Sequence, residues 1–178
     1  MNKNEEYVVD IIDNGFQGEG IAKIDGMTVF IPNVIKNEKV KVKILKVTSS
    51  LAYGKALEVI TKSEYRKDSD CDTFPRCGGC MIRHVEYDYT LEMKKIAVEA
   101  TLRKALGRTI EISEVWKMDN PYNYRNKLQY PVGINQSGEP VMGVYAERTH
   151  TIIPTTDCKI QDILSQNIAN DIYKFIAD

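Results

Sequence analysis

Four cysteines at uneven spacing constrain the fold of this chain more than any other feature. Three form a close group, Cys71-x5-Cys77-x2-Cys80, and Cys158 follows after a long gap. Disulfides need an oxidising compartment, and the polar N-terminus lacks the apolar stretch of a signal peptide. Zinc usually takes two close pairs of ligands, although His84 could complete a Cys3His site. An iron–sulfur cluster takes four thiolates, which need not be adjacent in sequence. The spacing therefore favours a cluster and leaves zinc open.

The residues between the cysteines agree with the cluster interpretation. Gly78 and Gly79 separate Cys77 from Cys80, and two glycines let the backbone bend around a bulky group and present N–H groups to it. Taken alone, Cys158 would be a small buried hydrophobic residue. It becomes a candidate because the group of three lacks a fourth thiolate. The expected metal ligands are Cys71, Cys77, Cys80 and Cys158.

The N-terminal region has the pattern of short strands separated by turns. Asp25-Gly26 is a hairpin signal, and residues 39–47 alternate lysine with apolar residues, so that one strand face is wet and the other is buried. Five short strands in about sixty residues predict a small barrel close to the OB fold in size. The predicted strands are residues 7–12, 21–24, 27–31, 39–47 and 52–60. We assign residues 1–62 to this barrel domain.

The charge of the barrel region is uneven. The formal net charge of the chain is −1, which argues against a strong nonspecific nucleic-acid binder, but lysines gather between residues 36 and 62. Lysines can track phosphates and an aromatic ring can stack on a base. The alternative is that these lysines form only the solvated face of a strand. The candidate RNA contacts in the barrel are Lys39, Lys41, Lys43, Lys46 and Tyr53.

The rest of the chain is predicted to be a polar linker followed by a mixed α+β domain. Residues 63–70 are the linker and residues 71–178 the second domain. Arg125 and Lys127 lie two apart in a predicted strand, so they would share a face, and both are candidate RNA contacts. His84 and His150 are expected to be buried hydrogen-bonding groups. The predicted elements are helices at 87–106 and 160–176 and strands at 110–116, 124–134, 141–147 and 151–154.

The cysteine group with the residues after it resembles a known family. Cys77-Gly-Gly-Cys80 followed by His84, Tyr87, Leu91 and Lys94 resembles the corresponding run of the RNA uracil-5-methyltransferases, which use S-adenosylmethionine to make 5-methyluridine in ribosomal and transfer RNA. Arg83 and Thr90 depart from the pattern, since the family usually has glutamine at both positions. These departures affect local contacts and leave the ligand pattern intact.

Three further stretches carry the same resemblance. Residues 124–132 resemble the family's Tyr-Arg-Asn-Lys-x-x-x-Pro-Val strand, and residues 143–150 resemble its Gly-Phe-Tyr and Arg-Ser-His stretch. Cys158 falls where the family places its fourth cluster ligand. Residues 18–40 resemble the TRAM domain, an OB-like RNA-binding barrel. The branch with both TRAM domain and cluster contains enzymes that act on ribosomal RNA, and the resemblance extends from about residue 5 to residue 175.

The resemblance implies an RNA-binding fragment of a larger enzyme. We expect an α+β chain, with a five-stranded OB-like TRAM barrel before an iron–sulfur domain that holds a 4Fe-4S cluster, and with the Rossmann-like catalytic domain absent. S-adenosylmethionine would bind only in that missing C-terminal methyltransferase domain, because the chain has no glycine-rich cofactor loop and no fifth cysteine. No catalytic residue is assigned, and the fragment alone is expected to be inactive.

The expected partners are RNA, in particular 23S rRNA, and the missing methyltransferase domain. No stretch has the ~18 apolar residues of a membrane span, so we expect no membrane contact and a cytoplasmic location. The protein is also expected to be a monomer. The alternatives are a stand-alone RNA-binding module and a zinc-binding protein.

Overall fold

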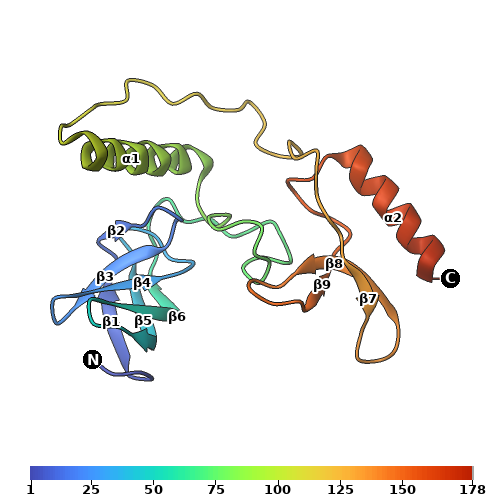
Figure 1. The fold of residues 1–178 in the computed structure, drawn as a ribbon, viewed down its shortest axis with the longest axis horizontal. Coiled ribbons are helices and arrows are strands. Elements are labelled where there is room, and N and C mark those ends of the chain that lie inside the picture. The colour runs from blue at the N-terminus through green and yellow to red at the C-terminus, as the bar shows by residue number, and fades with distance from the viewer. Residues whose placement is uncertain (178) are drawn as a thin grey trace. The chain divides into compact units, whose positions relative to one another are not determined.

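The computed structural model describes residues 1–177, which form two compact units (Figure 1). The first unit contains Met1–Asp68 and His84–Lys117, and the second contains Ser69–Arg83 and the chain from Met118 onward. The cysteine loop and the helix that follows it in sequence therefore belong to different units. The predicted linear boundaries at residues 62 and 71 do not describe this interleaving, and they stay a prediction.

The first unit is built on a six-stranded sheet whose order is β1-β5-β6-β4-β3-β2. All neighbouring strands are antiparallel except β4 and β6, which are parallel. The strands are β1 (Glu6–Asp10), β2 (Asp13–Asn14), β3 (Gly20–Ile24), β4 (Met27–Ile31), β5 (Lys39–Val47) and β6 (Leu51–Thr61).

The sheet has one strand more than the five predicted, because the two-residue β2 lies just after the first predicted strand, residues 7–12. β1 pairs with β5 and β2 pairs with β3, at the two ends of the strand order. Between them the Ile11 N–H donates to the Glu38 carbonyl and the Ile12 N–H donates to the Ile21 carbonyl, each at 2.8 Å. One bent segment thus bridges both edges of the sheet, so that the sheet curls toward a barrel, as in OB-like folds.

The interior of this sheet is filled by aliphatic side chains from every strand except the short β2. Gly54 is required in β6 because a Cβ there would lie 2.4 Å from Val42 Cγ2. The alternation of β5 places Val40, Val42 and Ile44 in the core, as predicted from the pattern. The buried core residues are Val9, Ile11, Ala22, Ile24, Val29, Ile31, Val34, Val40, Val42, Ile44 and Ala52.

The helix of the first unit, α1 (Tyr87–Leu106), has the predicted bounds. It ends at Gly107, which adopts a left-handed conformation with φ of 66° and donates its N–H to the Arg103 carbonyl. The strand predicted at residues 110–116 is wrong, since this segment pairs with no strand. The Ile112 N–H instead donates to a Glu99 carboxylate oxygen at 2.8 Å. Alternating apolar residues were not enough, because a strand needs a partner.

The second unit contains a three-stranded antiparallel sheet and a helix. The sheet order is β7 (Val132–Ile134), β8 (Pro140–Tyr145), β9 (Ile152–Pro154), and the helix is α2 (Ile163–Ala177). A Cβ at Gly143 would lie 1.9 Å from the Ile153 carbonyl oxygen, so the close approach of β8 and β9 requires this glycine. The buried apolar residues here are Val141, Met142, Val144, Ile153 and Ile160.

The strand predicted at residues 124–134 is formed only at its end, as β7. Pro131 lacks an N–H for a sheet ladder. Farther upstream, the backbone at Arg125 instead pairs with Gln161 through an isolated parallel bridge. Among residues 1–177, no helix is long and apolar enough to cross a membrane.

Candidate functional site: a cysteine pocket and a basic barrel face

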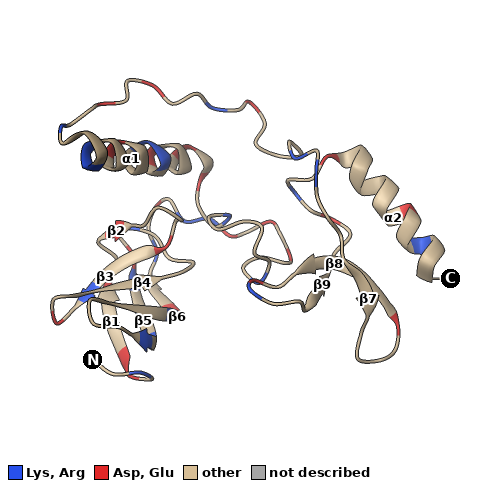
Figure 2. Ribbon diagram, in the orientation of Figure 1, with Lys and Arg blue, Asp and Glu red and all other residues tan. Residues whose placement is uncertain are grey.

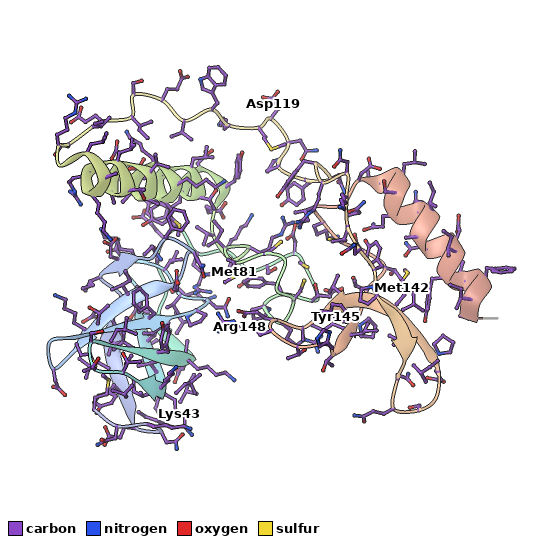
Figure 3. The ribbon with its side chains drawn as sticks, in the orientation of Figure 1. Lys43, Met81, Asp119, Met142, Tyr145 and Arg148 are labelled. Atoms are coloured by element: carbon purple, nitrogen blue, oxygen red, sulfur yellow. The ribbon has the colours of Figure 1, made fainter. Side chains whose placement is uncertain are left out.

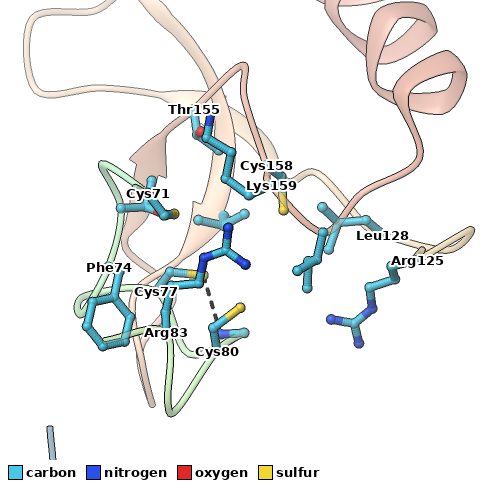
Figure 4. Close-up of a pocket in the computed structure, with 14 residues that line it drawn as sticks. Cys71, Phe74, Cys77, Cys80, Arg83, Arg125, Leu128, Thr155, Cys158 and Lys159 are labelled. Atoms are coloured by element: carbon cyan, nitrogen blue, oxygen red, sulfur yellow. Dashed lines mark hydrogen bonds between the residues drawn. The ribbon is translucent and has the colours of Figure 1, made fainter. Parts of the chain in front are cut away.

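All four cysteines line one pocket in the second unit (Figure 4). Three come from the loop at 69–83 and Cys158 comes from the segment between β9 and α2, as the spacing predicted. All four side chains are partly buried, and all four thiols are free. The other lining residues are Thr73, Phe74, Gly79, Arg83, Arg125, Leu128, Val144, Thr155, Lys159 and Ile160.

The cysteine loop is attached to the strand β8 side of the unit through backbone contacts. Cys77 forms an isolated antiparallel bridge with Ala146, and the Glu147 N–H donates to the Arg76 carbonyl at 2.9 Å. Within the loop, the Gly79 N–H donates to Cys77 Sγ at 3.3 Å. This bond is of the kind expected from the Gly-Gly pair, a backbone N–H directed at a ligand sulfur.

Cys158 is held by a second set of contacts, from segments distant in sequence. Its N–H donates to Gln166 Oε1 on α2 at 2.6 Å. The Arg125 N–H donates to the Ile160 carbonyl at 2.8 Å, and the Asp162 N–H donates to the Arg125 carbonyl at 2.9 Å. These bonds bring Arg125 to the cysteine pocket, where sequence reasoning did not place it. The expectation that Arg125 and Lys127 share a strand face is wrong, because neither lies in a strand; Lys127 is exposed and does not line the pocket.

The electrostatics of the pocket are set by thiols and cations. Burial raises the pKa of the Cys80 thiol, the Arg83 guanidinium opposes that shift, and the charges of the other three cysteines raise the pKa further. The lining residues include three cations, Arg83, Arg125 and Lys159, and no carboxylate. The four thiols would repel one another when ionised, and three cations lie beside them. The pocket therefore suits a bound group that neutralises the thiolate charges.

Of the two histidines expected to be buried, only His84 is. His84 is buried at 2% exposure in the first unit, where burial and the nearby Arg66 guanidinium lower its pKa to about 4. His150 was expected to be buried and is exposed, with its ring edge-on to Tyr145 at 5.5 Å between centroids. In the described part of the chain, no three His, Cys, Asp or Glu side chains are arranged to hold one metal ion together.

The predicted lysines of the barrel all lie on β5, but two of them are engaged in ion pairs. Lys41 Nζ lies 2.8 Å from Glu6 Oε2, and Lys39 Nζ lies 3.6 Å from Asp10 Oδ1. Both carboxylates belong to β1, which pairs with β5. Lys43 and Lys46 form no salt bridge with any of the residues 1–177.

Lys43 and Lys46 border an aromatic surface that continues onto β6 and β4. Lys43 is the register partner of Lys55, and Lys46 is the partner of Tyr53. Tyr53 in turn is opposite Phe30, with ring centroids 6.1 Å apart. We call these five residues, Phe30, Lys43, Lys46, Tyr53 and Lys55, the basic–aromatic face. Figure 2 colours the lysines and arginines of the ribbon blue, and Figure 3 labels Lys43. Sequence reasoning missed Phe30 and Lys55 because only the strand register brings them beside the predicted residues.

The structure thus combines an OB-like barrel with a pocket lined by four cysteines. Comparison with known proteins supports the barrel assignment. Residues 2–57 match the TRAM domain family. A protein of Clostridium acetobutylicum described as an uncharacterized RNA methyltransferase is 41% identical over the whole of this chain and 39% of its own length. Proteins described in the same words from Clostridium tetani and Staphylococcus aureus are 39% identical, over 99% of this chain.

The predicted resemblance is therefore confirmed: over its whole length the chain is homologous to RNA methyltransferases. It spans about two fifths of the length of these curated relatives. Among solved structures, Pyrococcus abyssi tRNA (uracil-54, C5)-methyltransferase, in complex with S-adenosyl-L-homocysteine, matches 95% of this chain and 36% of its own chain. The TM-score is 0.63 at 20% identity, so the two share a fold.

Proposed function

We propose that this chain is the RNA-recognition portion of an S-adenosylmethionine-dependent 23S rRNA (uracil-C5)-methyltransferase. The observation that carries the proposal is the whole-length homology to RNA methyltransferases. The TRAM match and the basic–aromatic face support it, because they supply a surface suited to RNA on the part of the enzyme that this chain spans. Methyl transfer itself, and the binding of S-adenosylmethionine, would belong to a methyltransferase domain outside this chain.

The basic–aromatic face would hold a single-stranded RNA segment. Lys43, Lys46 and Lys55 would contact phosphates, and Tyr53 and Phe30 would offer rings on which bases stack. OB-like barrels bind oligonucleotides through the corresponding strands. Held in this way, the strand would present one unstacked uridine to the methyltransferase domain, which needs the base out of the stack. Lys39 and Lys41 would contribute less, since each already has a carboxylate partner.

In the second unit, we propose that Cys71, Cys77, Cys80 and Cys158 hold a 4Fe-4S cluster. The residues fit such a group: four thiols line one pocket with three cations and no carboxylate. A cluster of this kind takes four thiolates, and the chain places four in this pocket, whereas zinc usually takes two close pairs of ligands. The bound cluster would tie the cysteine loop to the segment before α2. The chain's own residues position the four sulfurs and exclude water from part of their surface.

Helix α2 supports the proposed contact with a methyltransferase domain. Two of its side chains bond to the unit: Tyr173 Oη donates to the Pro140 carbonyl at 2.9 Å, and Asn170 Nδ2 donates to the Thr156 carbonyl at 3.0 Å. Its large apolar side chains are exposed, as are the charged Asp171 and Lys174. In the proposed enzyme, the methyltransferase domain would cover the apolar side chains. We propose that this enzyme is a cytoplasmic monomer. The exposed apolar residues are Ile163, Leu164, Ile168, Ile172, Phe175 and Ile176.

Salt-dependent RNA binding tests the recognition proposal. Each lysine that contacts a phosphate of single-stranded RNA contributes about 0.7 to the slope of log affinity against log salt concentration. Replacing Lys43, Lys46 and Lys55 together by alanine should lower that slope by about 2, measured by fluorescence anisotropy on a 23S rRNA fragment. The matched control replaces Lys3, Lys23 and Lys62. Equal slopes for the two triple variants would reject the face as the binding surface.

A further inference from the structure

Arg83 is the most firmly held cation of the cysteine pocket. Its Nε and Nη2 donate to the two carboxylate oxygens of Asp70 at 2.8 and 2.9 Å. The guanidinium carbon also lies 4.6 Å from the centroid of the Tyr122 ring. Only 12% of the Arg83 side chain is exposed. A planar group fixed by a two-bond carboxylate pair on its edge and a ring on its face has little freedom to move away.

This fixed cation borders the four thiols (Figure 4). The other two cations of the pocket are placed differently. Lys159 Nζ lies 2.5 Å from Asp157 Oδ2, and Arg125 is an exposed residue. Arg83 is thus the cation whose charge is both partly shielded from water and aimed at the pocket.

We propose that Arg83 is a positioning cation that stabilises negative charge on the group held by the four cysteines. The Asp70 carboxylate partly neutralises the Arg83 charge and so limits this stabilisation. The inference rests on the proposed cluster and deepens it. Reduction potentials of iron–sulfur clusters depend on the charge near them, and Arg83 makes reduction of the cluster easier.

The pair predicts shifts of opposite sign, which a merely structural role does not. The 178-residue chain is purified anaerobically, its iron and sulfide are measured, and the cluster is titrated with dithionite against redox mediators. Arg83→Gln should shift the reduction potential to a lower value, and Arg83→Lys should restore most of it. Asp70→Asn, which removes the carboxylate charge and keeps one oxygen that can accept from Arg83, should raise the potential because the guanidinium charge is then uncompensated. The matched control, Arg76→Gln, removes an exposed charge that does not line the pocket.

Two results would overturn the inference and leave the cluster in place. One is an unchanged potential in the Arg83 and Asp70 variants, and the other is a shift of the same sign in Arg83→Gln and Asp70→Asn. Iron and sulfide absent from the unmodified chain would overturn the proposed cluster and the inference with it. If Arg83→Gln does not retain a cluster, the reduction potentials of Arg83→Lys and Asp70→Asn decide. A potential of Asp70→Asn above that of the unmodified chain supports the proposal, and one equal to it or below it rejects the proposal.

Discussion

The two units of this chain rest on different kinds of interaction. The barrel buries eleven aliphatic residues in one continuous core. The second unit buries five apolar side chains, and four free thiols line one pocket in it. Burial of one aliphatic side chain contributes about 1.5–3 kcal/mol, so the barrel has roughly twice the hydrophobic stabilisation of the second unit. Small folds with few buried residues usually need a metal or a disulfide to stay folded.

This difference separates what each unit needs in order to fold. The barrel can form from its own side chains, and its basic–aromatic face lies on the sheet that this core supports. We expect the second unit to depend on the proposed cluster, because the free energy of metal binding to its four thiolates would contribute to the free energy of folding. We therefore expect changes at the cysteines to act on the second unit alone, and changes in the aliphatic core to act on the barrel alone.

The largest effect should come from removing a cysteine ligand. Cys158→Ser should unfold the second unit and lose most of the iron, because the loop at 69–83 would no longer be tied to the segment before α2. The barrel should stay folded. Limited proteolysis with mass spectrometry measures this, with cleavage expected in residues 118–177 and protection retained in residues 1–60. The exposed neighbour Thr156→Ser serves as control, and a resistant second unit in Cys158→Ser would contradict the expectation.

A cavity in the barrel core should have the opposite pattern. Ile44 is fully buried, and Ile44→Ala should lower the free energy of unfolding of the barrel by about 2–5 kcal/mol. Its neighbour Leu45 is 46% exposed, so Leu45→Ala should change stability by less than about 0.5 kcal/mol. Urea unfolding followed by circular dichroism measures both. Iron content should be the same in the two variants, and loss of iron in Ile44→Ala would break the separation of the units.

These two predictions use information of different origin in the sequence. The core position of Ile44 and the bounds of α1 followed from local pattern. The alternation of lysine with apolar residues in β5 and the glycine at the end of α1 can both be recognised from adjacent residues. The placement of the four cysteines around one pocket was expected from spacing and resemblance, and their role as ligands stays a prediction. The segment 110–116 and the position of Arg125 could not be predicted, because both depend on which distant backbone supplies hydrogen-bond partners. The pairing of Lys39 and Lys41 likewise depends on the register of β1 against β5.

A buried ion pair at the edge of the barrel gives a third prediction. Glu38 is 1% exposed and accepts hydrogen bonds from the Ile35 N–H at 2.9 Å and from the Arg66 guanidinium, which follows β6. Glu38→Ala should therefore lower barrel stability by about 3 kcal/mol, because it leaves a partly buried guanidinium without its partner. Thermal unfolding of this variant beside the exposed Glu58→Ala measures the difference. A shift no larger than that of Glu58→Ala would show that the pair contributes little.

The smallest predicted effect is a pH dependence of the first unit. The pKa of His84 is lowered from 6.5 to about 4, chiefly by burial, so the unfolded chain binds a proton that the folded chain does not in this range. Stability should therefore fall as the pH drops from 6.5, by about 2 kcal/mol at pH 5. His84→Gln should remove this part of the slope, and His150→Gln should keep it. Unfolding free energies at several pH values measure the slope, and identical slopes in the two variants would contradict the assignment.

The most direct test of the account compares amide hydrogen exchange in the two units with and without the proposed cluster. The chain is reconstituted anaerobically with iron and sulfide, and an identical sample is stripped with a chelator. We predict that β4, β5 and β6 exchange equally slowly in both samples, while β8, β9 and the backbone at Cys77 and Cys158 are protected only when iron and sulfide are bound. Equal protection of the second unit in the stripped sample would contradict the claim that its fold depends on the four cysteines.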